Sequence, residues 1–272
     1  MKGCDKKTDI EVTMREEKMD VLLLQETKLS KDTDMSETFV EGFVEVRLVR
    51  EGRGGGGVST YLRNGMGIVN SNGFSNGWIE VLAVTMKDTL YANIYKSPGI
   101  NVEQFKEGLE FLYGEIKGNE VDLVVAGDFN LPRIRMWSLI EMAETRTRIM
   151  RNRGEEVGDG VSQQEILMMD FVESYFLDQV VKKPTRENVT LDVVFTNAGN
   201  IRRVETISNS YTDHRSVVVN MVGYDKDVEE VRDRGDHYLS NIKNYKYEAL
   251  SEEKWKEVVS TFRGQLLGIL GT

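Results

Sequence analysis

The sequence predicts an α/β domain built on a mixed β-sheet, and three observations support this fold class. Short apolar runs end in polar residues, as in LVVAGDFN from Leu123 to Asn130, which is typical of buried strands that carry functional side chains at one end. Segments with apolar residues at helical spacing alternate with these runs. The 272 residues, 40% of them hydrophobic, suffice for one large domain with a sizeable core.

The chain begins with a predicted helix followed by a strand. Thr8 and Glu11 fit a capping box, and the spacing predicts a helix from about Thr8 to Lys18. The apolar run from Val21 to Leu24 predicts a strand, and Gln25, Glu26 and Thr27 follow its C-terminal end. Glu26 therefore occupies the same place after its strand as Asp128 does after the later one.

The middle of the first half predicts strands joined by turns. The glycine run GRGGGG, residues 52–57, lacks the Gly-Lys-Ser/Thr ending of a P-loop and predicts a flexible hairpin turn. Strands are predicted at Val58 to Leu62, Trp78 to Thr85 and Leu90 to Tyr95, and a helix at Asn101 to Ile116.

The second half continues with helices and then strands. Six arginines lie between residues 133 and 153, mostly on a predicted helix at about 137–151; they are typical of a solvated face, but Arg133 and Arg135 are candidates for contacts to phosphate. A helix is predicted at Ser162 to Tyr175. Strands are predicted at Leu191 to Asn197 and Ser216 to Asn220, joined by a linking stretch.

Residues 1–222 are predicted to form one domain. A charged linker follows at 223–250, and an amphipathic helix at 251–272 either docks on the domain or begins a further region. No run of residues is apolar enough to span a membrane, and the N-terminal residues lack the apolar stretch of a signal peptide. We therefore expect an intracellular protein without membrane partners, in the cytoplasm or the nucleus, with the nucleus favoured.

In the last two predicted strands, the polar residues stand at the start of the strand, whereas in the earlier strands they stand at the end. Asp192 opens its strand, and His214 precedes its strand. If the two kinds of strand run antiparallel, six polar residues gather at one rim of the sheet: Glu26, Asp128, Asn130, Asp192, Asp213 and His214. Taken singly, these residues also fit ordinary turns and a structural histidine.

Such a rim predicts an oxygen-ligand site for Mg²⁺ or Mn²⁺. One cysteine and two histidines exclude a zinc finger or ribbon. A histidine oriented by a carboxylate can contact phosphate or transfer a proton, and Asp128 with Asn130 can align and deprotonate a water. The net charge of −10 argues against a general attraction to nucleic acid but allows a local basic patch.

Six motifs in order, LLLQETKL, GGGVSTYLRNG, NIYKSPG, VVAGDFNLP, LDVVFTN and TDHRSVVV, resemble the endonuclease/exonuclease/phosphatase superfamily. Within it, they look most like the apurinic-site-like endonuclease domain of non-LTR (LINE-type) retrotransposon polyproteins. The resemblance covers about Thr8 to Met221. It implies a four-layered α/β sandwich with two mixed sheets packed face to face, and Mg²⁺-dependent nicking of DNA that leaves a 3′ hydroxyl to prime reverse transcription. It also implies DNA as partner and a reverse transcriptase domain in a longer polyprotein.

The resemblance also implies roles for individual residues. Glu26 and Asp213 match metal-site acids, and Tyr95 matches a tyrosine that helps to bind the scissile phosphate. Asp128 and Asn130 match the residues that align the attacking water and hold the phosphate. Asp192 matches the acid that pairs with the catalytic histidine, His214. Lys96 stands where relatives often carry an arginine and is a candidate substrate contact, as are Arg133 and Arg135.

The chain departs from the family pattern at its start. The family begins with a strand that carries an asparagine, whereas this sequence starts at Met1-Lys2-Gly3-Cys4, so we expect the usual first strand to be missing. Two alternatives to an active endonuclease follow. One is a phosphomonoesterase on the same scaffold. The other is a catalytically dead, nucleic-acid-binding remnant, which the missing strand favours and the retained polar residues argue against.

Overall fold

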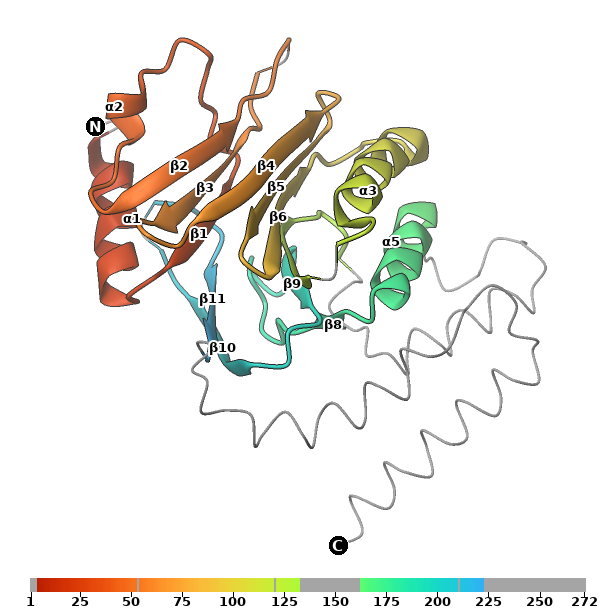
Figure 1. The fold of residues 1–272 in the computed structure, drawn as a ribbon. Helices are drawn as coiled ribbons and strands as arrows, with labels where there is room; N and C mark the ends of the chain where they lie inside the picture. Colours follow the sequence, from red (N-terminus) through yellow and green to blue (C-terminus); the bar gives the residue numbers. More distant parts are fainter. Residues whose placement is uncertain (1–3, 53, 120, 133–161, 210, 223–272) are drawn as a thin grey trace, which may run out of the picture.

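The fold is described by a computed structural model for residues 4–52, 54–119, 121–132, 162–209 and 211–222 (Figure 1). Arg133, Arg135, the predicted arginine-rich helix, the charged linker and the C-terminal helix lie outside these residues. None of the helices in the described part has the length and apolar composition needed to cross a bilayer.

The described elements include helices at the start and in the middle of the chain, separated by runs of consecutive strands. In order they are α1 (Cys4–Glu16), β1 (Val21–Gln25), α2 (Met35–Thr38), β2 (Phe43–Leu48), β3 (Val58–Arg63), β4 (Ile68–Ser75), β5 (Ile79–Met86), β6 (Thr89–Lys96), α3 (Val102–Ile116), β7 (Asp122–Asp128), α5 (Gln163–Ser174), β8 (Asp178–Gln179), β9 (Asp192–Thr196), β10 (Ile201–Ile207) and β11 (Ser216–Met221).

The strands form one large mixed sheet and two smaller antiparallel sheets. The large sheet has the order β4-β5-β6-β7-β9-β8, and only its β6–β7 pair is parallel. The small sheets have the orders β1-β3-β2 and β10-β11. Because β7 and β9 are antiparallel, the C-terminal end of one lies beside the N-terminal end of the other, as predicted.

The elements stack in four layers, which confirms the predicted α/β sandwich. α1 packs on the outer face of the three-stranded sheet through Met14, and Leu23 and Val217 of the two small sheets pack on the inner face of the large one. α3 and α5 cover its other face (Figure 1). The second β-layer, predicted as one mixed sheet, consists of two antiparallel sheets because no described strand joins β1 to β11.

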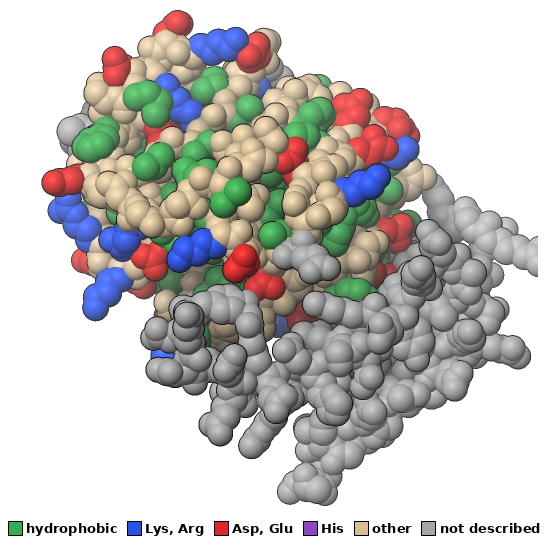
Figure 2. All heavy atoms as spheres, viewed as in Figure 1, with side chains coloured by type: hydrophobic (Ala, Val, Ile, Leu, Met, Phe, Trp, Pro, Cys, Tyr) green, Lys and Arg blue, Asp and Glu red, His purple; other side chains and the backbone are tan. Residues whose placement is uncertain are grey.

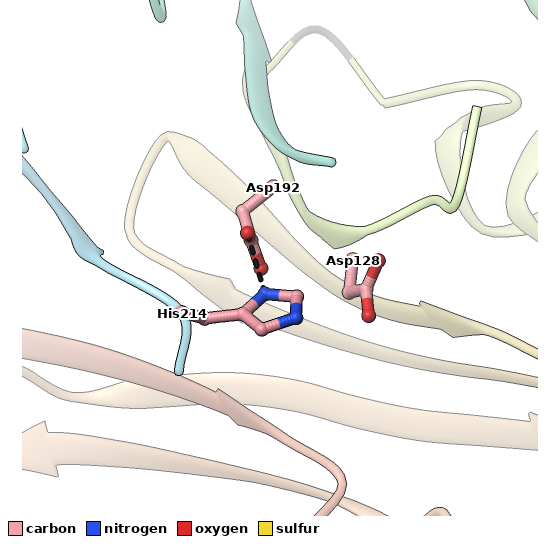
Figure 3. Close-up of side chains that lie close together, drawn as sticks. All are labelled: Asp128, Asp192 and His214. Carbon is pink, nitrogen blue, oxygen red and sulfur yellow. Dashed lines mark hydrogen bonds and ion pairs between the residues drawn. The ribbon is translucent and has the colours of Figure 1, made fainter. Parts of the chain in front are cut away.

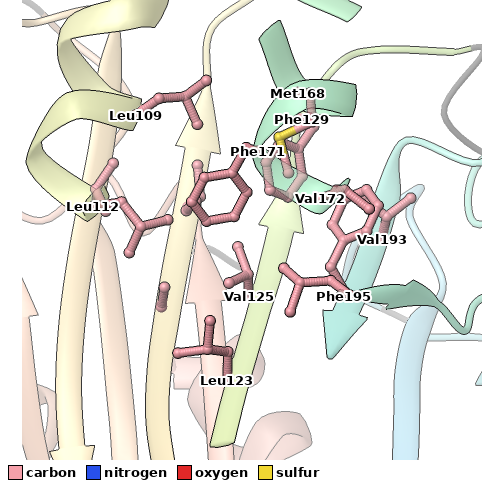
Figure 4. Packing of buried hydrophobic residues seen from close by; sticks show 14 of the residues in the cluster. Leu109, Leu112, Leu123, Val125, Phe129, Met168, Phe171, Val172, Val193 and Phe195 are labelled. Carbon is pink, nitrogen blue, oxygen red and sulfur yellow. The ribbon is translucent and has the colours of Figure 1, made fainter. Parts of the chain in front are cut away.

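The main core lies between the large sheet and its two helices. Figure 4 shows Leu109 and Leu112 of α3 and Phe171 of α5 facing the strands. Phe129, just after β7, meets Phe195 of β9 edge to face with their ring centroids 5.8 Å apart. Burial of these large side chains fixes β7 and β9 against the helices, and therefore fixes the rim at which both carry polar residues.

Asn93 ties the two β-layers together near that rim. It is fully buried on β6, and its amide donates to the Leu24 carbonyl at 3.2 Å and to the Ser59 carbonyl at 3.0 Å. The side-chain oxygen of Asn93, Oδ1, accepts from Gln25 Nε2 at 2.7 Å. The last residues of β1, just before Glu26, are therefore bonded directly to the central sheet.

Two sequence predictions are corrected by the structure. The first helix starts at Cys4, so Thr8 and Glu11 lie inside it and do not form a cap; the Lys7–Glu11 ion pair at 3.7 Å instead spans a helical turn. Residues 201–207, predicted as part of a linking stretch, form β10. The exposed Arg202 and Arg203 concealed the strand pattern there because β10 is an edge strand.

Replacing Asn93 with alanine is expected to lower the free energy of unfolding by about 1–3 kcal/mol, because buried polar groups of β1 and β3 lose their partners. Urea unfolding followed by circular dichroism measures the change. Asn70→Ala on the exposed face of β4 is the matched control and should stay within about 0.5 kcal/mol of the wild type. An equal effect of both substitutions would contradict the bridging role of Asn93.

Candidate active site

A row of polar side chains crosses the large sheet near one end. Ladder pairing places Glu80 opposite Tyr95, Tyr95 opposite Asp128, and Asp128 opposite Asp192. Residues directly opposite each other in a sheet point to the same face. Tyr95 belongs to the hydrophobic cluster between the β-layers, so this polar row (Glu80, Tyr95, Asp128 and Asp192) faces the second layer.

The backbone around Asp128 is specified by its neighbours. Gly127 has φ +149°, and a Cβ atom there would lie 1.8 Å from the carbonyl oxygen of Ile94, so only glycine allows β7 to approach β6 this closely. Asn130 takes a left-handed conformation with φ +47°. Its N–H donates to Asp128 Oδ1 at 3.1 Å and its side-chain amide to the Lys96 carbonyl at 2.9 Å. The turn therefore fixes the Asp128 carboxylate.

His214 approaches Asp128 from the segment before β11. Its Nδ1 lies 2.8 Å from Asp192 Oδ2, and the other ring nitrogen points toward Asp128 (Figure 3). One ligand atom from each of Asp128, Asp192 and His214 lies within 4.8 Å of the others. The three come from separate parts of the chain and form a compact group, here called the acidic cluster.

Asp128 and His214 of the acidic cluster both have raised pKa values. Burial and the neighbouring charge of Asp192 raise the pKa of Asp128 to about 7, and the charge of Glu26 acts in the same direction. The hydrogen bond from His214 to Asp192 raises the pKa of the histidine. The pKa of Asp128 is thus close to neutral pH, where its carboxylate can accept a proton. The raised pKa of His214 favours its protonated form, the imidazolium.

Thr185 joins the two segments that carry Asp192 and His214. Its side-chain oxygen accepts from the backbone N–H groups of Leu191 and Asp192 at 3.0 and 3.1 Å, and its carbonyl accepts from Arg215 N–H at 2.6 Å. It is fully buried. Sequence reasoning missed this residue because a single threonine in a loop has no pattern that distinguishes it.

Glu26 and Tyr95 form the second part of the site. The Tyr95 hydroxyl donates to Glu26 Oε1, and burial together with this carboxylate raises the pKa of the tyrosine. Glu26 has φ +51°, an uncommon backbone conformation for a residue other than glycine. Its side chain remains 48% exposed, so the carboxylate is held by Tyr95 and still open to solvent.

Asp213 and Lys96 interact with the acidic cluster through charge: Asp213 raises the pKa of His214, and Asp128 opposes the effect of burial on the pKa of Lys96. The Asp213 side chain is 68% exposed and its carboxylate pairs with Arg186 at 2.7 Å. Lys96 is buried on the other face of β6 from Tyr95, and burial lowers its pKa to about 8. Their predicted roles at the metal and the substrate stay predictions, as do those of Arg133 and Arg135.

The acidic cluster could hold a divalent cation. It offers the oxygens of two carboxylates, and the burial of negative charge that raises the pKa of Asp128 is the condition that a bound cation relieves. The charge of the half-exposed Glu26 carboxylate raises the pKa of Asp128, although Glu26 is not one of the three residues whose ligand atoms lie within 4.8 Å of one another. The donor set therefore fits a hard cation.

A known protein family matches most of this chain. The family described as Endonuclease/Exonuclease/phosphatase family matches residues 4–214. No curated protein matches the chain.

Several solved structures share the fold. One is the endonuclease domain of TRAS1, a telomere-specific non-LTR retrotransposon, with 15% identity and a TM-score of 0.53 over 81% of this chain and 93% of that one. Another is an AP endonuclease from Archaeoglobus fulgidus, with 13% identity and a TM-score of 0.54 over 79% and 93% of the two chains. A family protein from Leptotrichia buccalis C-1013-b has 14% identity and a TM-score of 0.54 over 81% and 93%.

Replacing Asp128 with asparagine is expected to stabilise the metal-free protein at pH 8.5 and to change its stability little at pH 4.5. A carboxyl whose pKa is higher in the folded protein than in the unfolded chain loses stability as the pH rises from about 4 through about 7. Asparagine removes that loss, which is expected to be at least about 1 kcal/mol.

Urea unfolding in EDTA at the two pH values measures this difference. Asp32→Asn, an exposed carboxyl, is the control and should show no comparable pH dependence. A substitution at Asp128 that destabilises the protein more at pH 8.5 than at pH 4.5 would contradict the buried-charge account.

Proposed function

This chain belongs to the endonuclease/exonuclease/phosphatase family, and from that premise we propose that it is a divalent-metal-dependent endonuclease that nicks DNA. The observation that carries the proposal is the acidic cluster, in which the Asp192–His214 pair lies beside a buried Asp128 with a raised pKa. Glu26 and Tyr95 complete the site. Such a set suits the hydrolysis of a phosphodiester bond by an activated water.

Mg²⁺ is the proposed cation, with Mn²⁺ as a substitute, and Glu26 with the carboxylates of the acidic cluster would hold it. When bound, the ion would polarise a phosphoryl oxygen and stabilise negative charge on the leaving oxygen. Carboxylate ligands suit both ions, which prefer oxygen donors.

The side chains of this chain would then divide the remaining work. Asp128 accepts a proton from the attacking water, and Asn130, fixed in its turn, orients that water. His214 has its Nδ1 bonded to Asp192, so its other ring nitrogen is left to donate to a phosphate oxygen. Water attacks phosphorus, the bond to the 3′ oxygen breaks, and the leaving 3′ oxygen takes up a proton from solvent, which leaves a 3′ hydroxyl and a 5′ phosphate.

DNA is the proposed substrate because solved structures with this fold include the endonuclease domain of a non-LTR retrotransposon and an AP endonuclease. On the face seen in Figure 2, basic and acidic side chains are interspersed among the described residues. Together with the net charge of −10, this favours recognition of DNA at the site itself over general attraction. We further propose that the domain acts in the nucleus beside a reverse transcriptase in a longer polyprotein.

The purified chain is expected to nick supercoiled plasmid with Mg²⁺ and to lose this activity in EDTA. Asp128→Asn and His214→Ala should each lower the nicking rate by about 100-fold or more, because each removes a group proposed to transfer a proton or to contact the phosphate. Gel analysis of the nicked form measures the rate. Asp32→Asn serves as the control with unchanged activity.

Three results would contradict the proposal. Nicking that survives both substitutions would point to a contaminant. Turnover of p-nitrophenyl phosphate without nicking would identify a phosphomonoesterase. Metal-independent binding of DNA without turnover, in a chain shown to be folded by circular dichroism, would identify an inactive binding module.

The nicks are expected to carry 3′ hydroxyl and 5′ phosphate ends. DNA ligase should therefore reseal the nicked plasmid without prior treatment, and a DNA polymerase should extend the 3′ end. Nicks that ligase seals only after end repair would contradict cleavage of the bond to the 3′ oxygen.

A further inference from the structure

A buried ion pair extends the polar row beyond the acidic cluster. Glu80 is fully buried and the Arg50 side chain is only 4% exposed. Arg50 Nε donates to Glu80 Oε1 at 2.5 Å and Nη2 to Oε2 at 2.8 Å, so the pair is bidentate. The same Nη2 donates to Ser97 Oγ at 2.9 Å. The guanidinium group is therefore fixed in both position and orientation.

This guanidinium group lies against Tyr95. Arg50 Cζ is 5.3 Å from the centroid of the tyrosine ring, within the range of a cation–π contact. Glu80 is the ladder partner of Tyr95 on β5, so the ion pair and the ring occupy neighbouring places in one row. The hydroxyl of the same ring donates to Glu26. A continuous set of contacts thus runs from Glu80 through Arg50 and Tyr95 to Glu26.

Gly56 and Gly57, at the end of the glycine run and here called the glycine loop, lie close to Arg50 and to the segment after Glu26. Gly56 has φ +71°, and a Cβ atom there would lie 2.3 Å from Arg50 Cζ, so a larger residue would displace the guanidinium group. The carbonyl of Gly56 accepts from Lys28 N–H at 2.8 Å, and that of Gly57 accepts from Thr27 N–H at 3.1 Å. The loop therefore encloses Arg50 and also holds the segment that follows Glu26.

The ion pair is better explained by positioning than by stability. Burying two charges costs desolvation energy, and buried ion pairs can often be replaced by apolar residues without loss of stability. Glu26, in contrast, needs support, because its left-handed backbone is strained and its side chain is half exposed. Two described contacts reach its carboxylate: the hydrogen bond from the Tyr95 hydroxyl to Oε1, and a long ion pair between Oε2 and the exposed Lys28 Nζ at 3.9 Å. An exposed lysine fixes its partner weakly, so Tyr95 is the contact that positions the carboxylate, and Arg50 packs on that ring.

We propose that Arg50, held by Glu80, is a positioning residue for the metal site: it fixes the Tyr95 ring, which in turn fixes the Glu26 carboxylate. This inference rests on the proposed function, in which Glu26 helps to hold the cation. Lysine cannot replace Arg50 in this role, because it keeps the charge but lacks the planar fork that binds Glu80 and Ser97 together.

The test measures Mn²⁺ binding by the full chain, using electron paramagnetic resonance of the free ion. Arg50→Lys is expected to weaken binding by about 10- to 100-fold, the usual effect of removing a group that orients a metal ligand. In a Tyr95→Phe background, Arg50→Lys should have little further effect, because the residue that transmits the positioning is already gone. Circular dichroism verifies that each variant is folded.

Arg63→Lys is the matched control. Arg63 Nε also bonds a carboxylate, Asp20 Oδ1 at 2.6 Å, and its Cζ lies 5.1 Å from the centroid of the Phe43 ring. It stands at the opposite end of β3 from the glycine loop, so its replacement should leave Mn²⁺ affinity unchanged. If Arg50→Lys fails to fold, the double variant Arg50→Met/Glu80→Gln removes both buried charges and takes its place, with the same expected loss.

Wild-type Mn²⁺ affinity in the Arg50 variants would overturn the inference, and so would additive effects of Arg50→Lys and Tyr95→Phe. A wild-type chain that binds no Mn²⁺ would overturn it as well. If Arg50→Lys weakens Mn²⁺ binding as expected but the wild type does not nick plasmid, the endonuclease proposal fails while the positioning role stands. The two failures are therefore distinguishable.

Discussion

The burial of the Asp128 carboxylate at the end of the central strand is the constraint on which the site depends. A buried negative charge beside Asp192 and near Glu26 is unfavourable without compensation, and its raised pKa expresses that cost. His214 and the N–H of Asn130 offset part of it. A divalent cation would offset more, so the electrostatics that make the buried carboxylate costly also favour a bound cation.

Two unusual backbone conformations accompany this arrangement. Glu26 and Asn130 both follow strands and both take left-handed conformations that aim their side chains at the rim. Several contacts hold each conformation. Asn130 bonds Asp128 and Lys96, while Glu26 is held by Tyr95 and by the bonds from the glycine loop to the residues that follow it. Local strain of this kind persists only where neighbouring contacts enforce it, and it is common at functional sites.

The layered architecture explains how residues far apart in sequence meet. Asp128 and Asp192 come together because β7 and β9 are antiparallel neighbours, and Thr185 then connects the start of β9 to the segment that carries His214. Glu26 follows β1 in the other β-layer, and the hydrogen bonds of Asn93 join that layer to the central sheet. The site is therefore assembled between the two layers, and the packing of those layers sets its geometry.

The sequence alone was enough for the α/β class and for most strands, and it placed Asp128, Asp192 and His214, which the structure brings together, at one rim. In a segment such as 123–130, the apolar residues indicate a buried strand and the polar residues after them indicate the turn at its end. Both signals are local in the sequence, because burial selects apolar residues and turns select polar ones. Edge strands such as β10 were not predicted, because charged residues on their exposed face obscure the apolar pattern of a strand.

Only the tertiary structure decided which polar residues meet. Asp213 and His214 are adjacent in sequence, yet His214 bonds Asp192 while Asp213 pairs with Arg186 at the surface. Arg50 and Glu80 belong to no recognisable sequence motif. Glu80 does stand within the apolar run IEVLAV, and a charged residue in such a run indicates a buried partner of opposite charge. Pairing between distant residues depends on strand register and layer packing, which a linear pattern does not contain.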